Sequence, residues 1–471
     1  MAENHDTVIY VDGGMNCIFR VPKVLQKHNP DAYTPCVLSI GPFHHRKKGS
    51  EDEGKDDKEE GKDGKDKKYF QLVERMKERY LNEVLSCMHI NLKELIAKVV
   101  ELSDQKNDGP IQFEKGARDF YAEKLDYESN YFKEMMIVDG CFLIQLFRKC
   151  TDVQPRGSDD PLFNMDCMFH FLCHDLLLLE NQLPWFVLET LYSLILAYSG
   201  GSGPSLSILI LDAFKHLPSL KHCQSYRDHL LQYHPHKQNW RGHGYANVLH
   251  ILDLMRDSIV VPIMFKDQTE KRFEQAFLDP DIHGMYTATA LSKAGITCRG
   301  NKTENIMDMQ FEEGWLFCNG VLKIPQLNVG MLTESLFRNL IAFEQCYHGI
   351  SNEITSYAVF MDNLISSQED MELLCKAKVI GNWLSDEEGC NFFNNLYKGI
   401  PRTKFYYGPL CKKVKKRYEM KWYTYVASFK TQKLSNPWAV LAFCTALILL
   451  VLQLWNSTNS LQSFRKQNHG F

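Results

Sequence analysis

The residues best suited to chemistry are two cysteines and two histidines in the string CMFHFLCH: Cys167, His170, Cys173 and His174. On a helix, positions 167, 170 and 174 share one face, and thiolates and imidazoles are preferred zinc ligands. A closed zinc site usually combines two short ligand pairs, however, and no second pair occurs. The favoured prediction is a packed polar and thiol face with no metal. A zinc site completed by a distant residue is the alternative.

Carboxylates in or beside strongly apolar segments form a second group, which includes Glu189. Paired carboxylates can exchange protons with a substrate, but only at a matched separation in a cleft. An unpaired buried charge costs several kcal/mol, so each needs a partner or a raised pKa. We predict polar contacts between helices, with Asn181 and Gln182 among the partners. The candidates for buried polar positions are Asp139, Asp175, Glu180, Arg338 and Glu344.

The familiar catalytic templates are missing. GGSG at 200–203 is not G-x-S-x-G, GHGYAN at 242–247 is not G-x-G-x-x-G, and G-x-x-x-x-G-K-[ST] does not occur. The sequence therefore predicts no catalytic residue, no cofactor and no small-molecule substrate. An enzyme that uses an unrecognised site built from Asp139, Asp175 and Glu180 is the alternative.

Composition narrows the class further. The chain has 471 residues, of which 44% are hydrophobic, and its net charge is -4, so it can bury a large core and gives no basis for nucleic-acid binding. Its fifteen cysteines are scattered without C-x-x-C pairs, which favours reduced thiols over a disulfide framework. The N-terminus has no signal-peptide pattern.

The elements that must position these residues are mostly helical. Helical spacing of apolar residues begins at Tyr69 and recurs at 131–149, at 165–198 with a break at Pro184, and at 335–344, 351–365, 370–378 and 387–397. Asn319-Gly320 between two apolar runs predicts a two-residue hairpin, and hence a small antiparallel β element over 295–329. The fold class is mainly α (α+β).

Several further segments complete the predicted organisation of the chain. Residues 17 to 46 are rich in proline and predict an extended lead segment, whereas 49–68 is a charged insert without apolar residues and predicts disorder. The predicted organisation is an N-terminal tail (1–16), one domain (17–430), a basic juxtamembrane segment (412–433), a transmembrane helix (438–455) and a short C-terminal tail (456–471).

The predicted anchor is the uncharged run WAVLAFCTALILLVLQLW, from Trp438 to Trp455. As a helix it would span roughly 27 Å, near the lower limit for a hydrocarbon core of about 30 Å. The anchor residues are Trp438, Leu441, Phe443, Ile448, Leu450 and Trp455. This length fits the endoplasmic reticulum more easily than the thicker plasma membrane, and either location stays open.

A basic cluster precedes the run and predicts its orientation. The cluster comprises Lys412, Lys413, Lys415, Lys416, Arg417, Lys421, Lys430 and Lys433. The positive-inside bias places the large N-terminal domain in the cytosol, and the same charges could attract anionic headgroups. A solvated helix face is the alternative for this cluster. The expected partners are the lipid bilayer and an unidentified protein.

Several long strings resemble one plant family. CIFRVPKVLQKHNPDAYTPCVLSIGPFHH, DGCFLIQLF, DLLLLENQLPWFVLE, LTESLFRNLIAFEQC and SNPWAV resemble the family called domain of unknown function 247, or uncharacterised protein family 0481. The resemblance extends from near residue 17 to the C-terminal run. The chain departs from the family at two positions: Gln145 stands where the family often has Glu, and Ala290 stands where the segment usually reads Thr-Glu.

The resemblance implies a helical plant membrane protein with a single C-terminal pass and no established enzymatic activity. Some grass members of the family are proposed as male determinants of self-incompatibility. Together with the residues, this predicts a membrane-anchored module for protein interaction or recognition, in self-incompatibility or in signalling.

Overall fold

The lead segment starts the fold with short turns. A computed structural model describes residues 16–45, 63–106, 113–215, 226–228, 230, 248–268, 285–303, 305–314, 319–382, 385–396, 398, 405–420 and 437–467. In the lead segment, α1 (Lys23–Gln26) and the 3-10 helix η1 (Pro30–Tyr33) are each four residues long. Past η1 the chain is irregular up to residue 45, as its prolines predicted.

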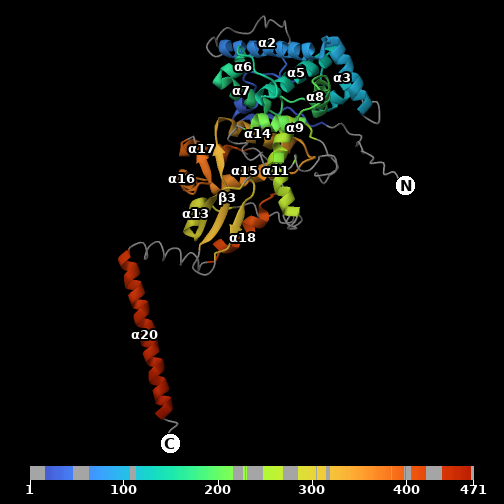
Figure 1. Ribbon diagram of the computed structural model, residues 1–471. Coiled ribbons are helices and arrows are strands. Elements are labelled where there is room, and N and C mark those ends of the chain that lie inside the picture. The colour runs from blue at the N-terminus through green and yellow to red at the C-terminus, as the bar shows by residue number, and fades with distance from the viewer. Residues whose placement is uncertain are drawn as a thin grey trace, which may run out of the picture.

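Helices build the lobe at the top of Figure 1. They are α2 (Asp63–Met88), α3 (Leu92–Lys106), α4 (Phe113–Asp119), α5 (Ser129–Cys150), α6 (Pro161–Asn164), α7 (Asp166–Leu176), α8 (Trp185–Tyr198) and α9 (Leu206–Phe214). The next helix, α11 (Ile251–Gln268), extends into the lower part, where it lies beside α15. Helix α5 lies at the centre and packs on α2, α8 and α9. Gly140 permits the close approach of α5 to α8, because a Cβ atom there would lie 2.4 Å from Leu191 Cδ1.

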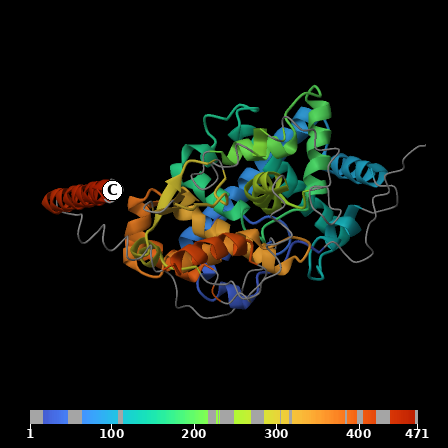
Figure 2. The same cartoon turned by 90° about the horizontal axis from the view of Figure 1, so that it is seen from below.

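The second half of the chain adds a small sheet and more helices, in the lower part of Figure 1. Its helices are α13 (Ala288–Lys293), α14 (Met331–Cys346), α15 (Glu353–Leu364), α16 (Gln368–Lys376), α17 (Asp386–Asn395) and α18 (Gly408–Tyr418). In Figure 2, which shows the molecule from below, the second half lies in front of the first. One continuous set of buried apolar residues extends from Cys17 to Val414, so both halves share a core.

The sheet differs from the predicted antiparallel hairpin. Strand β3 (Gly320–Pro325) pairs in parallel with β1 (Ile296–Asn301) and antiparallel with β2 (Gln310–Glu312). A second parallel pair joins β4 (Leu327–Val329) to β5 (Ile380–Asn382). The Asn-Gly signal correctly marked the start of a strand with an antiparallel neighbour, but it did not predict the parallel pairing with β1. Residues 315–318, the predicted first strand of the hairpin, lie outside the described part of the chain.

Most of the predicted helices are present, with shifted ends. The break at Pro184 separates α7 from α8, since residues 177–184 are not helical. Helix α2 begins at Asp63, so 63–68 of the predicted disordered insert are helical, and the rest of that insert lies outside the described residues. The helix therefore begins at Asp63, before Tyr69, the first residue of the apolar spacing.

The C-terminal helix α20 (Pro437–Gln467) covers the predicted anchor and stands apart from the other described elements in Figure 1. It continues past Trp455 through a polar stretch, Asn456 to Ser460. Within the described residues, no helix has both the length and the apolar character required to cross a bilayer. The structure thus leaves the predicted transmembrane helix without support.

Candidate functional site

Asp175 holds the backbone of the lead segment. It lies near the C-terminal end of α7 and is fully buried. Its Oδ1 accepts a hydrogen bond from the Cys36 amide at 2.7 Å, and its Oδ2 accepts from the amides of Val37 and Leu38, both at 2.7 Å. An extended segment without a strand partner must find acceptors for its N–H groups, and one carboxylate supplies them for three successive residues.

The turn after α7 continues this arrangement. Asn181 accepts from the Ile40 amide at 2.6 Å and donates to the Leu38 carbonyl at 3.0 Å. Glu180 accepts from the Val21 amide at 2.8 Å. The string DLLLLENQ therefore directs Asp175, Glu180 and Asn181 to the backbone of the lead segment, while its leucines enter the core. Its last residue, Gln182, instead donates to carbonyls of its own turn and accepts from the Leu252 amide of α11.

Asp139 of α5 completes the contacts as half of a buried ion pair. Its Oδ2 accepts from the Gly41 amide at 2.8 Å, and its Oδ1 lies 2.8 Å from Lys77 Nζ. Lys77 also contacts Glu74 at 2.9 Å and donates to the Ser39 carbonyl at 2.5 Å. Burial alone would lower the pKa of Lys77, but the charges of Asp139 and Glu74 outweigh it and raise that pKa.

These side chains form what we term the lead-segment clamp: Lys77, Asp139, Asp175, Glu180 and Asn181. Each is less than 5% exposed, and the carboxylates of all three acids accept hydrogen bonds from backbone amides of the lead segment. A carboxylate used in this way is not available to take a proton from a substrate. The geometry therefore argues against the enzyme alternative that was built on Asp139, Asp175 and Glu180.

A separate buried ion cluster joins α11, α14 and α15. Arg256 Nε lies 3.0 Å from Glu344 Oε1, and its Nη2 lies 2.5 Å from Glu353 Oε2. Glu344 also accepts from the amides of Ile354 and Thr355 at the start of α15, at 3.0 and 2.8 Å. Burial raises the pKa of Glu344 to about 7, against the opposing charge of Arg256. This cluster ties three helices together.

Arg338 is also buried but pairs within its own helix. Its Nε donates to Glu334 at 2.8 Å, the i,i+4 contact expected from the polar stripe on α14. In the described part of the chain it forms no hydrogen bond or ion pair with Asp139 of α5 or Asp175 of α7. Asn339, on the same helix, accepts from the Leu179 amide and donates to the Ala32 carbonyl, so α14 joins the lead segment as well.

The four candidate zinc ligands of α7 do not converge. Cys167 and His170 are exposed, whereas Cys173 and His174 are buried. Instead, His174 lies against a distant cysteine: its Nδ1 is 3.6 Å from Cys36 Sγ and 2.8 Å from Asp175 Oδ1. The ligand atoms of these three residues lie within 4.8 Å of one another, which meets the distance requirement for a metal site.

The hydrogen bonds of Asp175 argue against metal at this position. A carboxylate has about four acceptor sites. Oδ1 accepts from Cys36 N and His174 Nδ1, and Oδ2 accepts from the next two amides, so all four are used. An ion would have to displace donors that the lead segment needs. We interpret the cluster as hydrogen-bonded rather than metal-binding.

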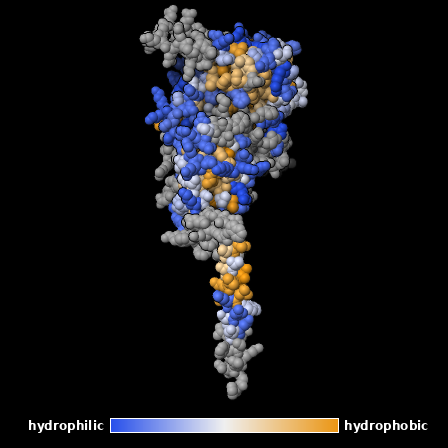
Figure 3. All heavy atoms as spheres, turned by 90° about the vertical axis from the view of Figure 1, so that its left-hand side faces the viewer, coloured by the Kyte–Doolittle hydropathy of each residue, from blue (hydrophilic) through white to orange (hydrophobic). Residues whose placement is uncertain are grey.

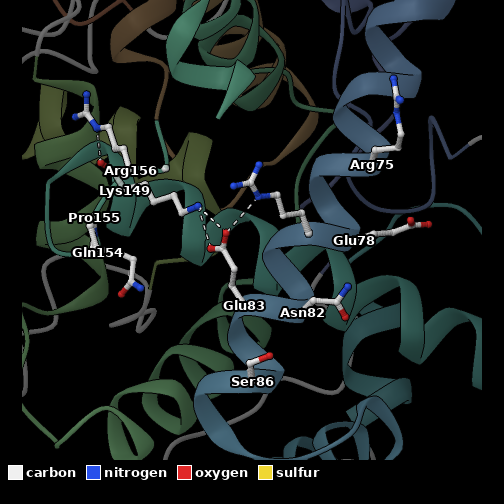
Figure 4. A pocket seen from close by; sticks show the side chains of 11 residues that line it. Arg75, Glu78, Asn82, Glu83, Ser86, Lys149, Gln154, Pro155 and Arg156 are labelled. Carbon is white, nitrogen blue, oxygen red and sulfur yellow. Dashed lines mark hydrogen bonds and ion pairs between the residues drawn. The ribbon is translucent and has the colours of Figure 1, made fainter. Parts of the chain in front are cut away.

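A polar groove of about 890 Å³ lies between α2 and the chain that follows α5 (Figure 4). Four of its lining residues are cationic: Arg75, Arg79, Lys149 and Arg156. Arg79 holds the exposed Asp159 through two hydrogen bonds of 3.1 and 2.9 Å. No residue of the lead-segment clamp lines this groove, so the groove and the buried carboxylates are separate sites.

Ion pairs also shape the floor of the groove. Lys149 Nζ lies 2.9 Å from Glu83 Oε2 and 3.3 Å from Asp160 Oδ2, and Figure 4 shows Lys149 and Glu83 pointing toward each other. Arg156 donates from Nε to the Lys149 carbonyl at 2.9 Å. In contrast, Arg75 is exposed, and its Nε donates to the Gln71 carbonyl of its own helix.

The predicted anchor residues are strongly exposed where their side chains are described. Leu441, Ile448, Leu450 and Trp455 are 59%, 57%, 57% and 66% exposed on α20, and Figure 3 shows their apolar band away from the domain. The side chains of Trp438 and Phe443 lie outside the described set. Exposed apolar area of this kind marks an interaction surface.

The basic cluster divides into two parts. Lys412, Lys413, Lys415 and Lys416 are exposed on α18, whereas Arg417 is buried and donates to the Gly314 carbonyl at 2.8 Å. Arg417 is thus a structural contact, a correction to its assignment to the juxtamembrane surface. Lys421, Lys430 and Lys433 lie outside the described residues.

Sequence reasoning missed Lys77, Arg256 and Cys36. Lys77 lies at helical spacing from the apolar residues Val73, Tyr80 and Val84, which was a readable sign of a buried charge. Arg256 likewise lies at helical spacing from buried apolar residues of α11, Leu252 and Ile259. Cys36 carried no local signal, because its contact with His174 joins positions far apart in the chain.

The class defined by this fold is a mainly helical domain with a small mixed sheet, a further parallel strand pair and buried ionic contacts. The chain belongs to the plant family of unknown function DUF247, whose model matches residues 18–452. It is 28% identical to the UPF0481 protein At3g47200 of Arabidopsis thaliana, over 96% of this chain and 88% of that protein. A second UPF0481 relative of Arabidopsis thaliana, At3g02645, is 22% identical over 92% of this chain and 88% of that protein. No solved structure matches the chain.

Proposed function

We propose that this protein is a membrane-anchored recognition module: its helical domain binds another protein, and its C-terminal helix attaches it to a membrane. The observation that carries this proposal is the division of its charged groups. The buried carboxylates hold the lead segment, whereas Arg79 of the open groove forms an exposed ion pair with Asp159. Such a division favours binding over catalysis.

The groove is the proposed partner surface. Arginine is enriched in protein interfaces because its planar guanidinium forms paired hydrogen bonds with carboxylates. Arg75 presents an exposed guanidinium on the outer face of α2, beside the paired Arg79 and Arg156. A partner that presents acidic side chains would complement this edge of the groove.

The attachment to a membrane is supported by two features. The run from Trp438 to Trp455 contains no charged residue, and the described apolar side chains of α20 are more than half exposed. The exposed lysines of α18 would add attraction to anionic headgroups, on the order of 1 kcal/mol for each lysine near the surface. Residence in the endoplasmic reticulum or the plasma membrane, with the domain in the cytosol, is part of this proposal.

For the biological role, we propose recognition in self-incompatibility or another signalling process, on the resemblance of the chain to its family. The test is proximity labelling from intact plant membranes, with the full chain compared with a chain stopped at Lys433. The proposal expects the truncated chain to lose both membrane recovery and its labelled neighbours. Unchanged recovery and neighbours would overturn the coupling of anchor and recognition.

A charge reversal tests the groove independently of the anchor. Arg75→Glu should lose the labelled neighbours while membrane recovery stays unchanged. The matched control is Lys93→Glu, which makes the same change in charge at an exposed position of α3 outside the groove. Equal labelling by both variants would exclude the groove as the partner surface.

The proposed orientation of the protein in the membrane can be tested separately, through glycosylation. Asn301-Lys-Thr lies in the domain and Asn456-Ser-Thr follows the apolar run, and both are glycosylation sequons. A cytosolic domain predicts no glycan on Asn301. A glycan at Asn301, detected as a mass shift removed by a glycosidase, would reverse the proposed topology.

A further inference from the structure

The groove beside α2 carries neutral polar side chains that the fold does not use. Asn82 and Ser86 are exposed on α2, and Gln154 is half-buried on the opposite wall (Figure 4). Within the described part of the chain, none of these three side chains forms a hydrogen bond. They face a space of about 890 Å³, so a ligand in the groove would meet open donors and acceptors on both sides.

The charges on the groove floor are already engaged. Lys149 contacts both Glu83 and Asp160, and Arg79 donates two hydrogen bonds to Asp159. A ligand that bound these two cations would have to displace carboxylates of the protein itself. The floor is therefore a paired surface on which a ligand lies, and its specific contacts must come from the walls.

The other two cations of the groove differ from each other. Arg156 donates to the Lys149 carbonyl and lies 3.2 Å from Asp152. In the part of the chain that the structure describes, Arg75 donates only from Nε, to a carbonyl of its own helix, and forms no contact with Glu78 on the same edge. Its two Nη groups are open. One open guanidinium matches one carboxylate of a ligand.

The open groups follow one wall at a regular spacing. Arg75, Asn82 and Ser86 lie seven and then four residues apart, so they share one face of α2. Asn82 and Ser86 are about 6 Å apart along the helix axis, close to the repeat of about 7 Å between main-chain groups on one side of an extended peptide. The whole row, about 16 Å long, corresponds to roughly five extended residues.

A peptide main chain also matches the chemistry of the walls. The amides of Asn82 and Gln154 each offer a carbonyl acceptor and N–H donors, the counterparts of the N–H and C=O of a peptide unit. A helical ligand uses these main-chain groups internally, so an extended segment is required. Neither wall is a strand, because one is α2 and the other is the end of α5 with the irregular chain after it. Side-chain amides thus take the place of strand pairing.

Nucleotides fit the groove less well. Nucleobases are usually held by stacking on aromatic rings, and none of the lining residues described for the groove is aromatic. A phosphate group is usually bound by several charged or backbone donors, whereas Arg75 is the cation with open terminal nitrogens. The groove therefore favours a ligand with one carboxylate and many amide groups.

We propose that the groove binds an extended peptide segment of the partner protein. Asn82 and Gln154 hydrogen-bond its main chain, and Arg75 pairs with one of its carboxylates. This inference rests on the proposed function and adds the class of ligand to it. The carboxylate belongs to an aspartate or glutamate side chain or to a C-terminus, which present the same chemistry to a guanidinium.

The test is affinity selection from synthetic random heptapeptides with free C-termini, by the full chain immobilised in mild detergent. The proposal expects enriched peptides that bind Arg75→Glu at least tenfold more weakly and bind the control Lys93→Glu unchanged. Amidation of the C-terminus, or replacement of the acidic side chain by its amide, then identifies which carboxylate is bound. Enriched peptides that bind Arg75→Glu unchanged would overturn the proposal.

Main-chain recognition has separate variants. Asn82→Ala and Gln154→Ala should each weaken a selected peptide about fivefold, because each removes one hydrogen bond. N-methylation of the peptide, one amide at a time, should produce a similar loss at one position or more. The matched control is Asn130→Ala, at an exposed position of α5 outside the groove. No loss in either groove variant would contradict main-chain recognition.

Failure of this inference can be told apart from failure of the proposed function. If no peptide is enriched while Arg75→Glu still loses its labelled neighbours in membranes, the groove binds a folded surface, and the peptide inference alone is overturned. If the labelled neighbours survive Arg75→Glu, the groove is not the partner surface, and the proposed function fails together with this inference.

Discussion

The lead-segment clamp and the groove on α2 use the same side-chain types in opposite surroundings. In the clamp, Asp175 is fully buried and Lys77 is 2% exposed. Arg79, which lines the groove, is 36% exposed at its side chain, and the side chain of its partner Asp159 is 73% exposed. Buried charges are costly to leave unpaired, and exposed pairs exchange readily with water. The comparison teaches that burial, and not residue type, separates the structural contacts from the surface that is free to bind.

The largest expected effect is at Asp175. Asp175→Ala removes the acceptor for three buried amides, and unsatisfied buried donors are expensive, so the free energy of unfolding should fall by about 3–5 kcal/mol. Urea unfolding of the full chain in mild detergent, followed by near-ultraviolet circular dichroism, measures this. A midpoint equal to that of the unsubstituted chain would remove the distinction between clamp and groove.

The second prediction concerns the ion pair of the clamp. Lys77→Met leaves Asp139 buried without its cation and should destabilise the chain by about 3 kcal/mol. Adding Asp139→Asn in the same chain removes the orphaned charge, so the double variant should be more stable than the sum of the two single effects by about 1 kcal/mol or more. Strict additivity in this cycle would show that the two side chains act independently.

The third prediction is a pH dependence from His174. Its pKa is raised from 6.5 to about 9 in the fold, so its contribution to stability is complete below pH 6.5 and is lost as pH rises to about 9. The size is up to about 3 kcal/mol. The stability difference between the unsubstituted chain and His174→Asn should shrink across this window. A constant difference from pH 6 to pH 9.5 would contradict the assignment.

The smallest effect is expected in the groove. Asp159→Ala breaks two hydrogen bonds to Arg79, but this pair lies in water and its loss should leave the urea midpoint unchanged. The same unfolding assay measures it beside Asp175→Ala. A loss comparable to that of Asp175→Ala would mean that the groove contacts are structural, and it would weaken the groove as a binding surface.

The helices were readable from sequence, and the strand pairing was not. Apolar spacing is local information, which is why α5 and α14 were predicted within a few residues of their ends. Besides its antiparallel neighbour β2, β3 pairs in parallel with β1, some twenty residues earlier, and β5 pairs with β4 only after three helices intervene. Such parallel pairings depend on tertiary packing, so the Asn-Gly signal predicted an antiparallel element but not the parallel strands.

For the candidate site, too, one part could be predicted from the sequence and another could not. The need of Asp139, Asp175 and Glu180 for partners followed from their apolar surroundings, and the identity of those partners did not. Asp175 binds amides 137 to 139 positions away, and a backbone N–H has no sequence signature of its own. The proline pattern predicted an extended lead segment, but only the fold places DLLLLENQ beside its amides.

The most direct test of the account is amide hydrogen exchange of residues 36–38 in the full chain. If Asp175 holds these amides, they should exchange as slowly as the core of α5, and Asp175→Asn should speed their exchange at least tenfold while α5 remains protected. Exchange at the rate of an exposed loop in the unsubstituted chain would contradict the clamp, and with it the division between buried and exposed charges.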